Sequence, residues 1–101
     1  MRRSVPETET VDTGQTVYLA LAVYDDDDVL ANASTVTCTI VRPSGTSDTA
    51  TVVQDGVGLY HAVYHTASKG TGDFYGYFTA TMADGAAGVE RFRIRVMPIW
   101  P

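Results

Sequence analysis

Apolar and polar residues alternate with a period of two along most of this chain, a pattern that predicts β-strands. The sharpest amphipathic segment is 89–97, with Phe92, Ile94 and Val96 on one face and Arg91, Arg93 and Arg95 on the other. No stretch of ten or more residues carries the apolar stripe of an amphipathic helix. The pattern therefore predicts an all-β chain.

Further alternating segments extend this prediction along the chain: 16–24, 35–42, 59–66 and 73–82, with a shorter and weaker one at 49–54. In 35–42, Val36, Cys38 and Ile40 share the expected inward face, so Cys38 is predicted to be buried. Both faces of 16–24 are apolar, which is typical of a strand covered on both sides or lying in an interface.

Turn-forming residues separate these segments, including Pro43-Ser44-Gly45 and Asp55-Gly56-Val57-Gly58. With a loose first strand somewhere within 4–11, the count reaches about seven strands. Seven short strands at this spacing predict an immunoglobulin-like antiparallel β-sandwich. The expected organisation is an N-terminal arm at 1–13, the sandwich at 14–97 and a short C-terminal tail at 98–101.

Composition and charge narrow the range of partners. At 101 residues, 45% of them hydrophobic, the chain fits one globular domain. Residues 4–90 hold all twelve acidic residues and two basic ones, a net charge of −10, whereas the two ends are basic. Such an acidic body repels nucleic acid. No apolar run approaches the roughly 20 residues of a membrane span, so neither nucleic acid nor membrane is an expected partner.

The candidate metal and catalytic residues give weak signals. His61 and His65 lie about 13 Å apart on a strand, too far to share one metal ion. The run Asp25–Asp28 is an acidic turn that lacks the glycine and glutamate of an EF-hand loop, and calcium binding there stays open. Nothing resembles a nucleophile elbow or a phosphate-binding glycine loop. We therefore expect no enzyme activity and no cofactor.

Tyr60 has two alternative interpretations. The spacing Asp55-x-x-Gly58-x-Tyr60 resembles a tyrosine corner, in which the hydroxyl bonds to backbone a few residues upstream. The other interpretation is simple packing in the core.

The candidate partner interface consists of arginine and aromatic residues, which are enriched at interaction hot spots: Arg2, Arg3, Tyr75, Tyr77, Arg91, Arg93, Arg95, Ile99 and Trp100. The arginines of 89–97 form either a binding edge or a solvated face with weak cross-strand ion pairs. Ile99 and Trp100 follow Pro98 at the end of the chain, and we expect them to insert into a pocket on a neighbouring molecule.

Several short elements resemble small immunoglobulin-like structural proteins of tailed-phage particles. They are the apolar strand and acidic turn of 17–28, the strand and turn of 35–44, Gly58-Leu59-Tyr60, the aromatic segment 71–77 and the closing strand Glu90–Ile94. Gly76 and Phe78 depart from this pattern, which usually has a larger aromatic there.

The resemblance implies a non-enzymatic virion protein that either decorates or cements the capsid or serves as a head–neck or tail accessory. Its partners would be other virion proteins in a symmetric multi-copy assembly, formed in the host cytoplasm. A chain with its own Met1, no signal-like segment and a single cysteine suits that setting. The alternative is an adhesion or carbohydrate-binding immunoglobulin-like module.

Overall fold

The computed structural model describes residues 2–3 and 8–98, which form nine strands and, within those ranges, no helix. In chain order the strands are β1 (Arg2–Arg3), β2 (Thr8–Asp12), β3 (Thr16–Ala22), β4 (Thr35–Val41), β5 (Ser47–Ala50), β6 (Val52–Gly56), β7 (Leu59–His65), β8 (Gly72–Thr81) and β9 (Ala87–Met97). No helix long and apolar enough to cross a membrane occurs in this part of the chain.

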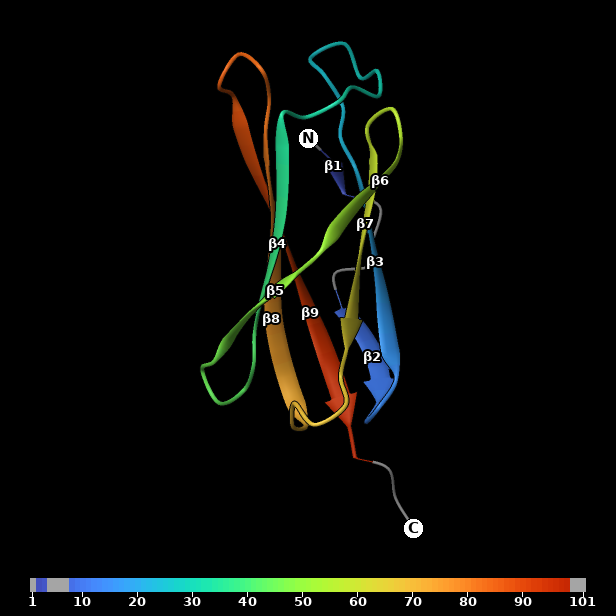
Figure 1. Cartoon of the computed structure of the whole chain (residues 1–101), viewed down its shortest axis with the longest axis vertical. Coiled ribbons are helices and arrows are strands. Elements are labelled where there is room, and N and C mark those ends of the chain that lie inside the picture. The colour runs from blue at the N-terminus through green and yellow to red at the C-terminus, as the bar shows by residue number, and fades with distance from the viewer. Residues whose placement is uncertain (1, 4–7, 99–101) are drawn as a thin grey trace.

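Two sheets pack face to face in an elongated sandwich (Figure 1). One sheet has the order β1-β3-β7-β6 and the other the order β2-β9-β8-β4-β5. The predicted immunoglobulin-like β-sandwich is confirmed by this architecture.

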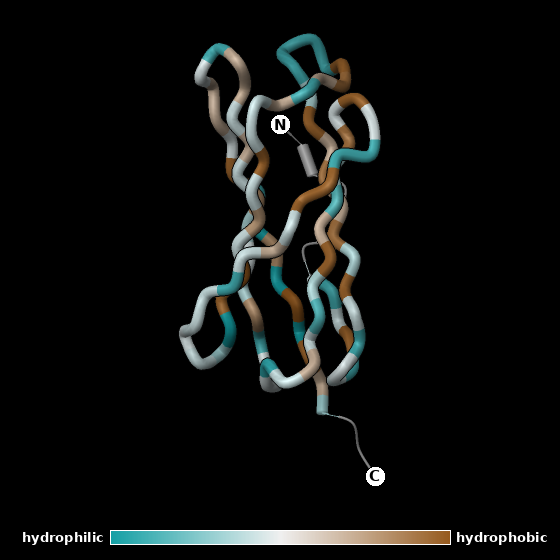
Figure 2. Tube along the Cα trace, in the orientation of Figure 1, coloured by the Kyte–Doolittle hydropathy of each residue, from teal (hydrophilic) through white to brown (hydrophobic). Residues whose placement is uncertain are grey.

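The core lies between the sheets and contains one residue in two from each long strand, as period-two alternation requires. Its largest fully buried side chains include Phe74, Phe78, Leu19, Leu21, Ile40 and Ile94. Figure 2 shows the same alternation of hydrophobic and hydrophilic positions along the chain. Cys38 is fully buried, as predicted, and burial raises the pKa of its thiol to about 12.

The N-terminal segment corrects the predicted domain boundary. Residues 8–12 form β2 and pair along β9, from Thr8 opposite Arg93 to Asp12 opposite Met97, so the loose first strand expected within 4–11 is present, but the arm expected at 1–13 is wrong for this part. This pair is parallel, whereas an antiparallel sandwich was predicted. Val11 shows why the segment joins the domain: it lies opposite Val96 and packs against the core.

The weak segment 49–54 was predicted to be one strand but contributes to two. β5 pairs with β4 in the five-stranded sheet, and β6 pairs with β7 in the four-stranded sheet. The chain changes sheets at Thr51, crossing the sandwich diagonally (Figure 1). Ala50 and Val52 both contact the core on either side of that crossing, so the switch exposes little apolar surface.

Candidate protein-interaction face

Five of the predicted interface residues share the outer face of the five-stranded sheet, the face that points away from the core. We call this surface the arginine–tyrosine face: Tyr75, Tyr77, Arg91, Arg93 and Arg95. β8 and β9 pair so that Tyr75 lies opposite Arg93 and Tyr77 opposite Arg91. Directly opposite side chains in an antiparallel pair have Cβ atoms about 5 Å apart. The register therefore makes one continuous surface from residues 14 to 20 positions apart in sequence.

The two tyrosines are exposed because their neighbours on β8 occupy the core. Tyr75 is 56% exposed and Tyr77 39% exposed, whereas Phe74 and Phe78 are completely buried. Exposed tyrosine rings offer a large apolar contact area with a polar hydroxyl at the end, a combination enriched at protein interfaces. Sheet geometry thus holds two such rings on a rigid surface.

The three arginines of this face are not equivalent. Arg95 forms an exposed ion pair with Asp73, with 3.1 Å between Nε and Oδ1. Arg93 is half-buried, and its Nη2 donates a long hydrogen bond of 3.4 Å to Thr8 Oγ1. Arg91 is exposed and has no carboxylate partner among the residues described. An open, shallow depression lies around Arg91, Arg93 and Tyr75.

The pairing of β9 corrects the binding-edge interpretation for two of its three arginines. β8 pairs with β9 from Ala87 to Val96, but β2 covers the other side only from Arg93 to Met97, so Arg93 and Arg95 lie on an interior stretch of the sheet. The backbone of that stretch is engaged in two ladders and cannot accept a further strand. Arg91 lies where β9 pairs with β8 alone among the described residues. At Arg93 and Arg95 a partner would have to lie on the face and contact side chains.

The other predicted interface residues do not join this face in the part of the chain that the structure describes. Arg2 and Arg3 pair with Ala22 and Leu21 of β3, which belongs to the opposite sheet. The side chains of Arg2 and Arg3 lie outside the described part, as do Ile99 and Trp100 altogether. The expected insertion of Ile99 and Trp100 into a neighbour's pocket stays a prediction.

The two histidines have separate structural contacts. His61 stacks on Tyr18 with ring centroids 4.8 Å apart, and its Nδ1 lies 2.7 Å from Asp55 Oδ2. The Nδ1 of His65 lies 3.0 Å from Thr16 Oγ1. Across residues 8–98, no three histidine, cysteine or acidic side chains are grouped as metal ligands would be.

The acidic run closes a turn through its first residue. Oδ1 of Asp25 accepts hydrogen bonds from the backbone N–H groups of Asp27 and Val29, at 2.9 and 3.1 Å. Such side-chain to backbone bonds are the usual reason for aspartate in a turn. Asp25 therefore already stabilises its own loop.

Of the two interpretations of Tyr60, the tyrosine corner is wrong, and packing in the core is confirmed. Its hydroxyl oxygen accepts a hydrogen bond of 2.9 Å from the backbone N–H of Ala33, 27 residues upstream instead of a few. Tyr60 is buried, so the bond fixes the long connection between β3 and β4 against β7. Beside it, Oδ1 of Asn32 accepts a bond of 3.0 Å from the backbone N–H of Gly58.

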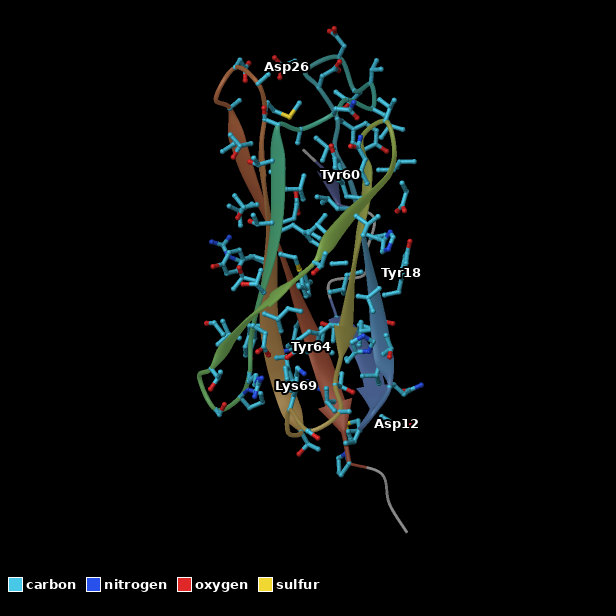
Figure 3. All side chains as sticks on the ribbon, in the orientation of Figure 1. Asp12, Tyr18, Asp26, Tyr60, Tyr64 and Lys69 are labelled. Atoms are coloured by element: carbon cyan, nitrogen blue, oxygen red, sulfur yellow. The ribbon has the colours of Figure 1, made fainter. Side chains whose placement is uncertain are left out.

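A polar network that the sequence did not indicate joins the beginning of β5 to β7 of the other sheet. Arg42 donates two hydrogen bonds to Asp48, of 2.7 and 2.8 Å, and the Tyr64 hydroxyl donates a third of 2.6 Å. Lys69 Nζ lies 5.5 Å from the centre of the Tyr64 ring, and both side chains are labelled in Figure 3. A fork-shaped guanidinium on a carboxylate is among the stronger polar contacts in proteins.

The network shifts the ionisation of its members. The hydrogen bonds from Arg42, and secondarily from Tyr64, lower the pKa of Asp48, although partial burial opposes them. Burial, together with the bond to the Asp48 carboxylate, raises the pKa of Tyr64. The charged form of Asp48 is therefore favoured in the folded state.

Replacing Asp48 with asparagine should remove a pH-dependent part of the stability. The folded pKa of Asp48 lies below its unfolded value of about 3.9. The contribution of this carboxylate is consequently complete above the unfolded pKa and lost as pH falls through the folded pKa. Urea unfolding of wild type and Asp48→Asn should differ most near neutral pH, and the difference should shrink in acid. A difference that stays constant from neutral pH into acid would contradict this assignment.

Comparison with known proteins shows the fold only. No family model matches the chain, and no curated protein matches it in sequence. A DUF4785 family protein from Legionella pneumophila superposes with a TM-score of 0.75 at 10% identity, covering 92% of this chain and 27% of its own. The chain thus spans about a quarter of that protein.

Two further solved structures are similar over most of both chains. CopC from Methylosinus trichosporium has a TM-score of 0.62 at 13% identity and covers 95% of this chain and 89% of its own. The Lin-41 filamin domain has a TM-score of 0.64 at 14% identity, with 86% and 83% covered. Together with the two-sheet topology, these similarities identify the chain as an immunoglobulin-like β-sandwich.

Proposed function

We propose that this chain is a non-enzymatic structural protein of a tailed-phage particle, which binds other virion proteins through the arginine–tyrosine face. The observation that carries the proposal is the in-register row of exposed Tyr75 and Tyr77 beside Arg91 and Arg93 on a rigid sheet. Tyrosine and arginine are the residues that most often dominate the binding energy of protein interfaces.

A structural role also agrees with how the polar side chains are used. Asp48, His61 and Tyr64 take part in contacts that link strands of the sandwich. These hydrogen bonds give the three side chains a role in holding the strands together. The proposal therefore assigns the chain a contact surface and no reaction.

A small domain gains binding strength from repetition. One sheet face of a 101-residue chain offers a limited contact area, and weak contacts become effective when many copies are placed by symmetry. A virion provides such repetition. The proposal leaves capsid decoration and a head–neck or tail position as the two settings, both in particles assembled in the host cytoplasm.

Co-sedimentation with particles that lack the chain tests this proposal. Virions from a phage deleted for the gene are mixed with the purified chain, and the bound copies per particle are measured. We expect saturable binding that falls roughly tenfold in affinity for Tyr77→Ser, since loss of a central interface tyrosine typically costs more than 1 kcal/mol. Tyr18→Ser is the matched control, because Tyr18 is an exposed tyrosine of the other sheet, 59% accessible.

Two results would overturn the proposal. One is a wild-type chain that does not sediment with particles, and the other is a Tyr77→Ser chain that binds as well as Tyr18→Ser. Binding to an insoluble polysaccharide in place of particles would favour the adhesion or carbohydrate-binding alternative.

A further inference from the structure

The arginine–tyrosine face contains two guanidinium groups with no carboxylate partner among the described residues. Asp73 pairs with Arg95, and no acidic side chain of the described residues pairs with Arg91 or Arg93. This is unusual in a chain whose residues 4–90 carry a net charge of −10. Positive charge is therefore concentrated beside Tyr75 and Tyr77, toward the Arg91 end of the face.

Arg93 carries a specific sign of an unfilled contact. Its Nε is buried and has no hydrogen-bond acceptor in the described structure, and its Nη2 bond to Thr8 is long, at 3.4 Å. A buried charged donor without a partner is costly. A ligand carboxylate that drew the guanidinium outward would relieve that cost. The free energy of binding of an anionic partner is therefore more favourable here than on an ordinary solvated face.

The spacing of the two arginines selects the shape of such a partner. Arg91 and Arg93 are two residues apart on one strand, so their Cα atoms are separated by about 7 Å. An extended peptide with acidic residues at alternate positions repeats the same distance along one side. Its intervening side chains would point away from the sheet, and its backbone would lie along the tyrosine rings.

The surrounding charges favour a short acidic segment over a nucleic acid. Asp73 and Asp12 lie on the same outer face near the Arg95 end, opposite Arg95 and Met97. A long polyanion would have to pass over these carboxylates and over the acidic body, where it is repelled. A segment with two or three carboxylates fits beside Arg91 and Arg93 without extending as far as Asp73 and Asp12.

We propose that the arginine–tyrosine face binds an extended acidic peptide segment of a partner protein, with carboxylates at alternate positions held by Arg91 and Arg93. This inference rests on the proposed function, because it names the chemistry of the partner at the same face. The guanidinium groups bind the carboxylates, and Tyr75 and Tyr77 supply the apolar contact between them.

A titration with two synthetic peptides tests the inference. One peptide alternates glutamate and serine, and the other has the same composition with its glutamates contiguous. Binding to the isotope-labelled chain is followed by NMR at low salt, including the Nε–H signals of the arginines. We expect the alternating peptide to bind several-fold more tightly and to move the Arg91 and Arg93 signals most. These are charge-assisted contacts that weaken with added salt.

Matched charge variants separate the specific contact from overall charge. Arg91→Gln and Lys69→Gln each remove one positive charge, and Lys69 lies over Tyr64 on β7, away from this face. We expect Arg91→Gln to weaken peptide binding roughly tenfold, about 1.4 kcal/mol, and Lys69→Gln to change it less than twofold. Equal affinity for the two peptides, equal losses in the two variants, or tighter binding of a single-stranded oligonucleotide of the same charge would overturn the inference.

The two proposals can fail separately. If neither peptide binds but Tyr77→Ser still reduces particle binding, the face has a partner of other chemistry, and only the inference is wrong. If the alternating peptide binds as expected but the chain does not sediment with particles, the acidic-segment site stands and the virion role is wrong.

Discussion

Gly58→Ala is expected to lower the free energy of unfolding by about 3 to 4 kcal/mol, because it combines a conformational penalty with a close backbone approach. Gly58 has a φ of +70°, and an added Cβ would lie 2.7 Å from the carbonyl oxygen of Val23 and 2.8 Å from the amide nitrogen of Ala31. Neither atom can move freely, because the N–H of Ala31 donates to the same Val23 oxygen. Urea unfolding followed by circular dichroism measures the loss.

Gly70→Ala is the matched control for this prediction. Gly70 also has a positive φ, +96°, but nothing lies within 4 Å of the Cβ position. We expect it to cost only the conformational penalty, about 1 to 2 kcal/mol. The difference between the variants measures how tightly the turn between β6 and β7 packs against the connection between β3 and β4. Equal losses of unfolding free energy in the two variants would show that the connection between β3 and β4 can move aside at little cost.

Gly76→Ala is expected to cost about 3 kcal/mol for a different reason, namely overpacking of the core. Gly76 lies opposite Phe92, and an added Cβ would be 2.4 Å from two atoms of that ring. The ring cannot simply swing aside, because Phe92 is 5% exposed and packs against Phe78 at a centroid distance of 5.6 Å. Thermal unfolding should show a midpoint lowered by more than about 10 °C, at 4 to 8 °C per kcal/mol for a chain of this size.

A smaller side chain at 92 should rescue that variant in part. Phe92→Leu alone is expected to cost about 1 kcal/mol as a modest change of core volume. The double variant Gly76→Ala with Phe92→Leu should then be more stable than the sum of the two single losses predicts, with a coupling above about 1 kcal/mol. Strictly additive losses would show that the ring does not occupy the space over Gly76.

The ring of Phe92, from the neighbouring strand, fills the space that a side chain at position 76 would take. The alternation in 73–82 puts Gly76 on the face of Phe74 and Phe78, which the structure buries. It could not show that Phe92 covers it, because that depends on the register between β8 and β9.

The sequence predicted which side chains share a face of a strand, but it did not predict which distant residues meet across the sandwich. A period of two determines which side chains share a face, so burial of Cys38 and the outward position of the arginines on β9 followed directly. The Arg42–Asp48–Tyr64 network depends on where β5 turns relative to β7, and no local pattern encodes that. For Tyr60 the alternation could not choose between its two interpretations, because the partner of its hydroxyl lies in a loop 27 residues away.

The strands at 8–12 and 49–54 were harder to predict for a related reason. The segment 8–12 has a single apolar residue and 49–54 is short, so alternation gave little information about strand ends or sheet membership. β2 joins the domain through a small number of contacts, Val11 with the core and the ladder to β9. Contacts of this kind arise from the completed sheet and not from the segment itself.

The parallel pairing of β2 and β9 has a mechanical consequence. Tension that pulls the N-terminal side of β2 away from the C-terminal side of β9 would make these two strands slide past each other lengthwise. All the bonds from Thr8 opposite Arg93 to Asp12 opposite Met97 would then carry load together, with Thr13 adding two more to the Met97 carbonyl. A hairpin pulled at its open end separates one bond at a time. This domain would resist stretching between its ends by shear.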